Sequence, residues 1–339
     1  MKKKMVTLLG ISIITAGIVS SVYKESKKID LKTFDKIADS TYRKFENTLT
    51  LHVISSPYGI NWKGKPRDVL LNILKNQYFF PNTRRSLGHV TTELNCSFTD
   101  DNGKRVSQRF IGGQGSKHIN QFSKMIRKDG VGFSILNSPM QYLDLPQLTV
   151  KGHFESFKDL APEYNSLIFK DNKMAFLTYR ITSGQCLKMR DFFLKYKEAT
   201  KETKDSANPL AGNNYGFGAD PLKLEGAGCA LFAEAFFRLA GREEESKLFK
   251  QTVYIKENQL GDPENGKEAS LIDLLLSTDQ ISKNEEGKRK FTFPDTDLMY
   301  KHAYMLKSDK NYNPNALDVR RNLSFGDSKA LYVVIDLNK

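Results

Sequence analysis

The sequence predicts an α+β fold in which an antiparallel sheet packs on a buried helix that carries a cysteine. Alternating apolar and polar residues indicate strands over 48–55, 87–99 and 104–111. Asp100-Asp101-Asn102-Gly103 separates the last two strands, and Asn-Gly between alternating runs is typical of a β-hairpin. The segment 227–240 has only two charged side chains, and a helix that is apolar on nearly every face belongs inside a protein.

Length and composition indicate a folded protein with a hydrophobic core. The chain has 339 residues, enough for one large domain or for a core with an appended region. Hydrophobic residues make up 39% of it and aromatic residues 11%, so a folded core is expected. The net charge of +13 favours an anionic envelope surface as a partner. The basic residues form no block and no aromatic–basic repeat, so we expect no nucleic-acid site.

The first residues resemble an export signal. Lys2, Lys3 and Lys4 precede an uncharged run over 5–22, MVTLLGISIITAGIVSSV. The length of this run lies between that of a cleaved signal peptide and that of a membrane-spanning helix. Residues 1–25 are therefore predicted to be a signal peptide or an N-terminal membrane anchor. The protein is expected to be exported, either periplasmic or anchored to the membrane and facing the envelope.

The cysteines bear on both compartment and chemistry. Cys96, Cys186 and Cys229 are an odd number in a chain that is expected to meet oxidising surroundings. One thiol must then stay reduced or pair between molecules. The spacing of the cysteines fits no zinc pattern, and the five histidines do not cluster near them. We therefore predict no metal site and no cofactor.

The remaining elements follow from periodicity and turn residues. Apolar residues at helical spacing predict a helical lead-in over 26–47. Further helices are predicted over 66–77, 116–128, 183–199 and 300–305, and further strands over 147–154, 173–181 and 330–337. Ser183 is expected to cap its helix, and 197–214 is expected to be a loop. The glycine-rich segment 112–115 is predicted to break the second hairpin strand.

The last part of the chain differs from the rest in composition. Residues 242–339 are richer in charge, with turn clusters over 261–266 and 284–287. They end in an apolar run suited to a buried strand. This C-terminal extension is expected either to form a small second lobe or to complete or flank the first sheet.

Cys229 is the candidate nucleophile. It lies at the first turn of the apolar helix, and Gly226 and Gly228 loosen the chain before it. A helix N-terminus stabilises a thiolate over a thiol. The alternative is a cysteine that is simply buried. A mechanism also needs a base, and His89 is the best candidate because Gly88 lets a substrate or another backbone approach closely.

The strand that carries His89 has two distinct faces. Because side chains alternate along a strand, His89, Thr91, Glu93 and Asn95 share one face. Val90, Thr92 and Leu94 share the other face. The prediction of a catalytic pair requires the imidazole of His89 to reach the sulfur of Cys229.

These residues resemble a known family. Tyr215-Gly216-Phe217-Gly218, then Gly226-Ala227-Gly228-Cys229-Ala230-Leu231-Phe232, is similar to the nucleophile segment of the NlpC/P60 cysteine peptidases. Gly88-His89-Val90-Thr91-Thr92-Glu93-Leu94 is similar to the histidine strand of that family. Here the histidine precedes the cysteine, which resembles the circularly permuted branch of this papain-like superfamily. The resemblance implies a permuted NlpC/P60-like domain over 48–241.

The resemblance also implies roles for four residues. His89 would take the proton from Cys229, and the thiolate would attack a carbonyl carbon. Gln114 is preferred to Gln108 and Ser107 as the polar residue that orients the imidazole; the alternative is that Gln114 is a turn residue, which is the commoner role of a glutamine flanked by glycines. Tyr215 is the candidate for a second oxyanion donor beside the Cys229 backbone, or else an aromatic ring that packs under the loop. The family signature Asp-Cys-Ser-Gly is reduced here to Gly-Cys-Ala-Leu.

Three functions follow from this resemblance. The first is an exported cell-envelope thiol hydrolase that cleaves an amide bond, for example in peptidoglycan peptides. The second is a lipid acyltransferase or ester hydrolase, as in other permuted relatives. The third is a catalytically inactive envelope binding protein that kept the fold and lost the activity. The expected partners are a cell-wall peptide or a lipid-like acyl substrate, together with the anionic envelope surface.

Overall fold

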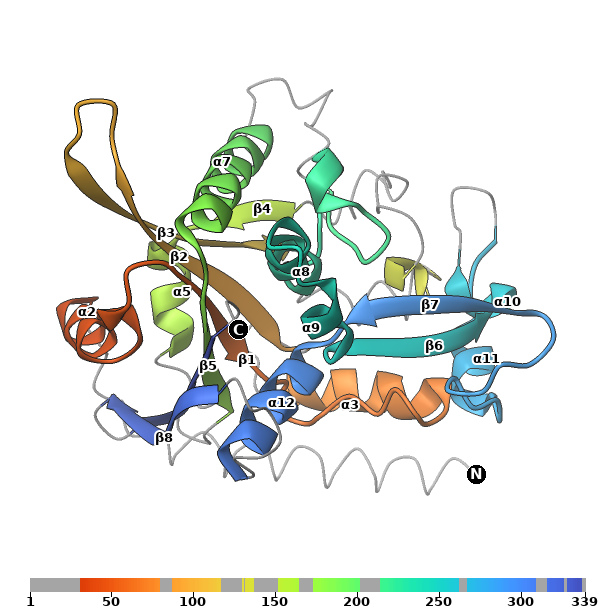
Figure 1. Cartoon of the computed structure of the whole chain (residues 1–339). Helices are drawn as coiled ribbons and strands as arrows, with labels where there is room; N and C mark the ends of the chain where they lie inside the picture. The colour runs from red at the N-terminus through yellow and green to blue at the C-terminus, as the bar shows by residue number, and fades with distance from the viewer. Residues whose placement is uncertain are drawn as a thin grey trace.

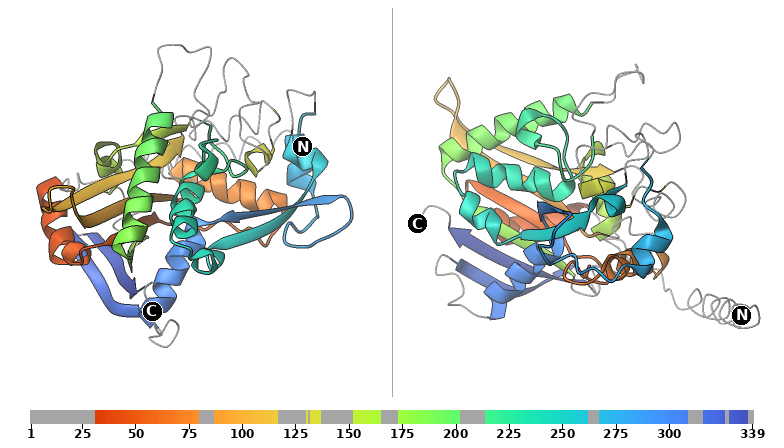
Figure 2. Two further views of the ribbon diagram at one scale, coloured as in Figure 1. Left: turned by 45° about the horizontal axis from the view of Figure 1, so that its top comes forward. Right: turned by 90° about the vertical axis from the view of Figure 1, so that its right-hand side faces the viewer.

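The structure is α+β, as the sequence predicts. The computed structural model describes residues 31–79, 87–116, 130, 132–136, 152–164, 173–201, 214–261, 267–308, 316–325 and 328–336. Within these residues, one seven-stranded mixed sheet is covered by helices on both faces, and a two-stranded sheet lies beside it (Figures 1 and 2). The predicted signal or anchor over 1–25 and the predicted helix over 117–128 lie outside the described residues.

The large sheet has the strand order β4-β3-β2-β1-β5-β9-β8. Its strands are β1 Thr48–Ile54, β2 His89–Thr99, β3 Arg105–Ser116, β4 Gly152–Glu155, β5 Met174–Arg180, β8 Ala316–Phe325 and β9 Ser328–Asp336. All neighbouring pairs are antiparallel except β5 and β9, which are parallel. Strand β1 lies at the centre and is buried along its whole length, since strands flank it on both sides and cores cover both of its faces.

The glycine-rich segment 112–115 does not end the second hairpin strand, which corrects that prediction. Strand β3 continues through it to Ser116 and pairs there with β4. The glycines serve close approach instead. A Cβ atom on Gly112 would clash with the ring of Phe154, and one on Gly115 would clash with the carboxylate of Glu155. The missing side chains leave room on β3 for two residues of β4.

The C-terminal extension contributes to both sheets. Strand β9 pairs with β5 and so extends the large sheet, while β8 forms its edge. Strands β6 Lys250–Lys256 and β7 Lys288–Pro294 form the two-stranded sheet. The short elements of this region and of the loops are η3 Ser134–Leu136, η6 Pro221–Lys223, α9 Glu243–Lys247, α10 Glu257–Leu260 and α11 Leu271–Leu276.

Three helices cover one face of the large sheet, which we call the α8 face. They are α7 Ser183–Ala199, α8 Cys229–Leu239 and α12 Thr296–Ser308. Phe232 of α8 packs among aromatic rings, with its ring centroid 4.8 Å from that of Tyr196 and 5.9 Å from that of Phe154. Leu94 of β2 belongs to the same core. The all-round apolar character of α8 is therefore matched by burial on all sides, as predicted.

The opposite face, which we call the α2 face, is covered by α2 Leu31–Ser40, η1 Tyr42–Lys44 and α5 Phe157–Tyr164. The predicted lead-in helix is thus a helix followed by a 3-10 turn. Tyr42 stacks on Phe176 of β5, with ring centroids 5.2 Å apart. Apolar residues of β5 and β9 complete this second core.

A buried charge network fastens η1 to the α2 face of the sheet. Glu93 of β2 pairs with Arg43, and its second oxygen lies 3.0 Å from Nε2 of His52. The hydroxyl of Tyr42 donates to the same oxygen at 3.1 Å. Burial alone would raise the pKa of Glu93, but the hydrogen bonds and charges of His52 and Arg43 outweigh it and lower the pKa to about 2. Burial lowers the pKa of His52, so Arg43 supplies the balancing charge.

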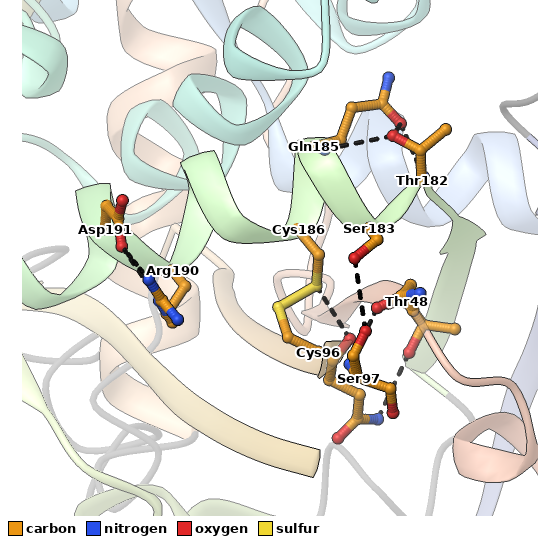
Figure 3. Close-up of a disulfide and its surroundings, with 11 residues drawn as sticks. Thr48, Cys96, Ser97, Thr182, Ser183, Gln185, Cys186, Arg190 and Asp191 are labelled. Carbon is orange, nitrogen blue, oxygen red and sulfur yellow. Dashed lines mark hydrogen bonds and ion pairs between the residues drawn. A yellow bond between two sulfur atoms is a disulfide. The ribbon is translucent and has the colours of Figure 1, made fainter. Parts of the chain in front are cut away.

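A disulfide fastens α7 to the opposite face of the same strand. Cys96 of β2 and Cys186 in the first turn of α7 are joined across 90 residues of sequence (Figure 3). Thr182, and not the predicted Ser183, caps α7, because its side chain and that of Gln185 form a reciprocal capping box. Ser183 instead donates to the Ser97 carbonyl at 3.4 Å.

A third core lies between α3 Pro66–Phe79 and the two-stranded sheet. Trp62 packs edge-on against Phe293 of β7, with ring centroids 5.1 Å apart. Val69 and Ile73 give α3 its buried side. No helix in the described part of the chain is long and apolar enough to cross a bilayer.

Removing the disulfide should weaken the fold. We expect the double variant Cys96→Ser, Cys186→Ser to lose about 2–4 kcal/mol of unfolding free energy, because a bridge across a long loop restricts the unfolded chain. Chemical denaturation measures the loss. Unreduced, denatured protein should titrate a single thiol, from Cys229, against three after reduction. Three thiols before reduction would contradict the pairing.

Removing Arg43 should leave a buried carboxylate without its counter-charge. We expect Arg43→Ala to cost about 3–5 kcal/mol of unfolding free energy. The adjacent exposed residue supplies the control, Lys44→Ala, which should change stability by less than about 0.5 kcal/mol. The contribution of Glu93 is present above pH 4.5 and is lost as the pH falls towards about 2, since its folded pKa is depressed. Equal stability of the two variants at neutral pH would refute the network.

Candidate functional site

Cys229 lies where the sequence predicts it, at the first residue of α8. Gly228 is the N-cap of the helix, and Cys229 is not part of a disulfide. The preceding loop is held closely: Gly226 has φ +107°, and the Ala227 amide donates to the Asn214 carbonyl at 3.1 Å. The residue is only 7% exposed and packs in the core of the α8 face.

His89 begins β2 and lies beside a carboxylate. Its Nε2 is 2.8 Å from an oxygen of Glu155 on β4, although β3 runs between their two strands. Gly115 makes this possible, because the Glu155 carboxylate occupies the space that a side chain there would fill. The other oxygen of Glu155 is 3.9 Å from Nε2 of His153. Imidazole and carboxylate thus meet across a strand that has no side chain at the crossing point.

Strand register places His89 and Cys229 on opposite faces of the sheet. His89 pairs with Ile54 of β1, and Ile54 packs in the core of the α2 face. The next residue, Val90, packs in the core that contains Cys229. Neighbouring side chains on a strand point to opposite sides, so the imidazole is directed to the α2 face. This corrects the predicted Cys229–His89 pair.

Gln114 faces the other way from His89. It pairs with Phe154, whose ring packs against Phe193 and Phe232 on the α8 face. Its side chain is fully buried on that face, so it is not placed to orient the imidazole. Glu155 occupies the position beside His89 that Gln114 was predicted to have. The sequence contains one signal for this, the spaced glycines of β3, which make room for a partner from β4.

Tyr215 lies in the third core. It is 7% exposed and belongs to the cluster that contains Trp62, Val253 and Phe293. This position favours the alternative interpretation of Tyr215, an aromatic ring that packs under the loop before α8. Within the described ranges, no group of three His, Cys, Asp or Glu residues is arranged to hold a metal ion.

Gly88 accommodates the protein's own chain. Its φ is +75°, and a Cβ atom there would clash with the hydroxyl of Thr296 and approach the Ile54 carbonyl. Thr296 in turn donates to the Leu87 carbonyl at 3.1 Å. The predicted gap for a substrate before His89 is therefore filled by the start of α12.

Two aspartates organise the start of α12. Asp297 accepts from the Ser55 and Ser56 hydroxyls at 2.7 and 2.6 Å, and from the Ile60 amide at 3.0 Å. Asp295 caps the helix by accepting from the Asp297 amide at 2.8 Å. Burial, followed by the negative charge of Asp297, raises the pKa of Asp295 to about 7. The sequence analysis did not single out either residue.

Comparisons with known proteins give no relative. The chain matches no model of a protein family, and neither a curated protein nor a solved structure is significantly similar to it. The resemblance to NlpC/P60 peptidases therefore stays a prediction from sequence motifs.

The raised pKa of Asp295 predicts a pH-dependent stability. Between pH 4 and about 7 the unfolded chain loses this proton while the folded protein keeps it, so stability should fall as the pH rises. The full loss is about 1–4 kcal/mol. Asp295→Asn keeps a capping oxygen and should remove this slope.

Thermal denaturation across this pH range measures the difference between the two proteins. Asp273→Asn, at an exposed carboxylate on α11, is the control and should retain the slope of the parent protein. Parallel curves for Asp295→Asn and the parent protein would contradict the assignment.

Proposed function

We propose that this chain is an exported protein of the cell envelope that acts by binding and does not catalyse thiol chemistry. The observation that carries the proposal is the direction of the two candidate groups, with the Cys229 thiol in the α8-face core and the His89 imidazole on the α2 face. A thiol hydrolase needs its imidazole within hydrogen-bond reach of the sulfur. The acyltransferase alternative relies on the same pair and loses the same support.

Export is supported by two independent features. Disulfides persist in oxidising compartments and are rare in reducing ones, and Cys96–Cys186 joins two elements of the main core. The three lysines and the apolar run over 5–22 are typical of an export signal. Together they favour a domain that folds outside the cytoplasm.

The likeness to the permuted NlpC/P60 branch fits this proposal as a retained framework. Helix α8 packs on the antiparallel strands β2 and β3, which is the layer that the resemblance implies. The residues with predicted catalytic roles depart from the arrangement that the resemblance implies. The signature is reduced around Cys229. Gln114 faces away from His89, and Tyr215 is part of a core. A fold can keep its layers after its site has changed.

The net charge of the chain favours an anionic partner. The chain has 52 basic and 39 acidic residues. Several carboxylates are engaged inside the protein: Glu93 with Arg43, Glu155 beside His89, and Asp297 of α12 with the loop before α3. The net charge of +13 supports attraction to an anionic envelope surface.

Cysteine reactivity tests the proposal. In the folded protein near neutral pH, Cys229 should react with iodoacetamide about 100-fold more slowly than in urea, because alkylation requires the α8-face core to open. His89→Ala should leave the rate unchanged. Mass spectrometry of the labelled peptide measures it, and Cys229→Ala provides the blank. Rapid labelling that drops in His89→Ala would overturn the proposal and restore the thiol hydrolase.

A further inference from the structure

Helix α3 exposes a stripe in which basic and apolar residues alternate. Arg67, Leu71, Lys75 and Tyr78 are all exposed, and their spacing of four, four and three residues places them on one side of the helix. Leu71 is 44% and Tyr78 61% exposed. Pro66, Val69, Leu70 and Ile73 form the buried side.

A second helix adds to this surface. Helix α11 lies against α3 (Figures 1 and 2), and its Leu274 is buried in the core that α3 also lines. Ile272 and Leu276 point outward and are 66% and 73% exposed, more than the other large apolar residues of the described structure. Exposed large apolar residues thus occur on two helices that contact each other, whereas Leu194 is the one such residue on α7.

The charges on this surface are of both signs, with Arg67 and Lys75 on α3 and the carboxylates of Asp68 and Asp273. Asp68 is the sole acidic residue of α3, and it is half-buried where it accepts from the Lys65 amide. Its other oxygen is 3.7 Å from the Arg67 guanidinium, so part of that positive charge is balanced locally. Asp273 on α11 is exposed and is the one carboxylate of that helix. Lys75 is exposed between the two exposed apolar groups of α3, Leu71 and Tyr78.

We propose that this surface docks on the anionic head groups of a phospholipid bilayer. It consists of Arg67, Leu71, Lys75 and Tyr78 of α3 together with Ile272 and Leu276 of α11. Leucine and isoleucine enter the boundary of the acyl chains, tyrosine lies at head-group depth, and Arg and Lys pair with phosphates. The proposal deepens the proposed envelope function, on which it rests for its compartment.

A bilayer fits this surface better than a second copy of the chain does. Two copies would bring like charges together in a protein whose net charge is +13. An anionic bilayer attracts that charge. The apolar run over 5–22 precedes the domain in the same chain, so contact at α3 and α11 would add to an attachment that begins there.

Photo-crosslinking from defined positions tests the docking in the full chain. Benzoylphenylalanine is placed at position 71, and in a matched control at position 194 of α7. Each protein is mixed with vesicles of phosphatidylglycerol and phosphatidylcholine, irradiated and analysed by mass spectrometry. We expect lipid adducts from position 71 and none above background from position 194. Adduct yield at position 71 should fall about tenfold in the Arg67→Gln, Lys75→Gln background, or in vesicles of phosphatidylcholine alone.

The outcomes separate the two proposals. Absence of lipid adducts at position 71, or equal yields at both positions, would overturn the docking and leave the assignment from Cys229 reactivity intact. Crosslinks between two protein chains at position 71 would identify a second copy as the occupant and also overturn it. Circular dichroism of each variant checks that it is folded, and a second labelling position at Tyr78 replaces position 71 if that variant does not fold.

Discussion

The alternation of side chains along β2 is the constraint on which the rest of the structure depends. This strand lies between β1 and β3 and is buried on both faces over 89–94, so successive residues there point to opposite faces of the sheet. Glu93 holds the Arg43 network on the α2 face, and Cys96 holds α7 on the α8 face. A slip by one residue would move the carboxylate into the aromatic core of α7 and α8 and would separate the two cysteines. Polar pairing on one side and a covalent bond on the other therefore specify the same register.

That constraint also explains what the sequence could and could not predict. Elements such as β1 and α8 were predictable, since local periodicity, the Asn-Gly turn and the apolar run of α8 are local signals, whereas β6, β7 and β8 were not predicted. The alternation of β2 separates His89 from Val90 and Leu94, but the face of β2 that α8 covers was not predictable, because it depends on packing between distant segments. Gln114 was misplaced for the same reason. Its flanking glycines indicate a turn when read locally, whereas β4 fills the space that they leave.

Pairings between residues far apart in the chain were the second feature that the sequence could not predict. The cysteine count predicted one thiol that stays reduced or pairs between molecules. It did not predict that Cys96 and Cys186 would pair, because that choice depends on α7 packing over β2. The strand 328–336 was predictable as an element, yet its parallel pairing with β5 depends on the path of the intervening chain. Asp295 and Asp297 look like ordinary turn carboxylates in the sequence. The role of Asp297 arises from Ser55 and Ser56, more than 200 residues away in the chain.

The same arrangement bears on the proposed binding function. A carboxylate beside an imidazole is a useful acid–base pair when both groups face a substrate. Here His89 is 1% exposed, and the start of α12 fills the space before it. The polar groups at this end of the sheet instead fix β4, the loop before α3 and α12 to one another. Because α3 is held by that loop and by the third core, its outer stripe is presented on a rigid support. Rigid presentation reduces the conformational entropy lost on docking, which favours recognition by a surface over chemistry in a cleft.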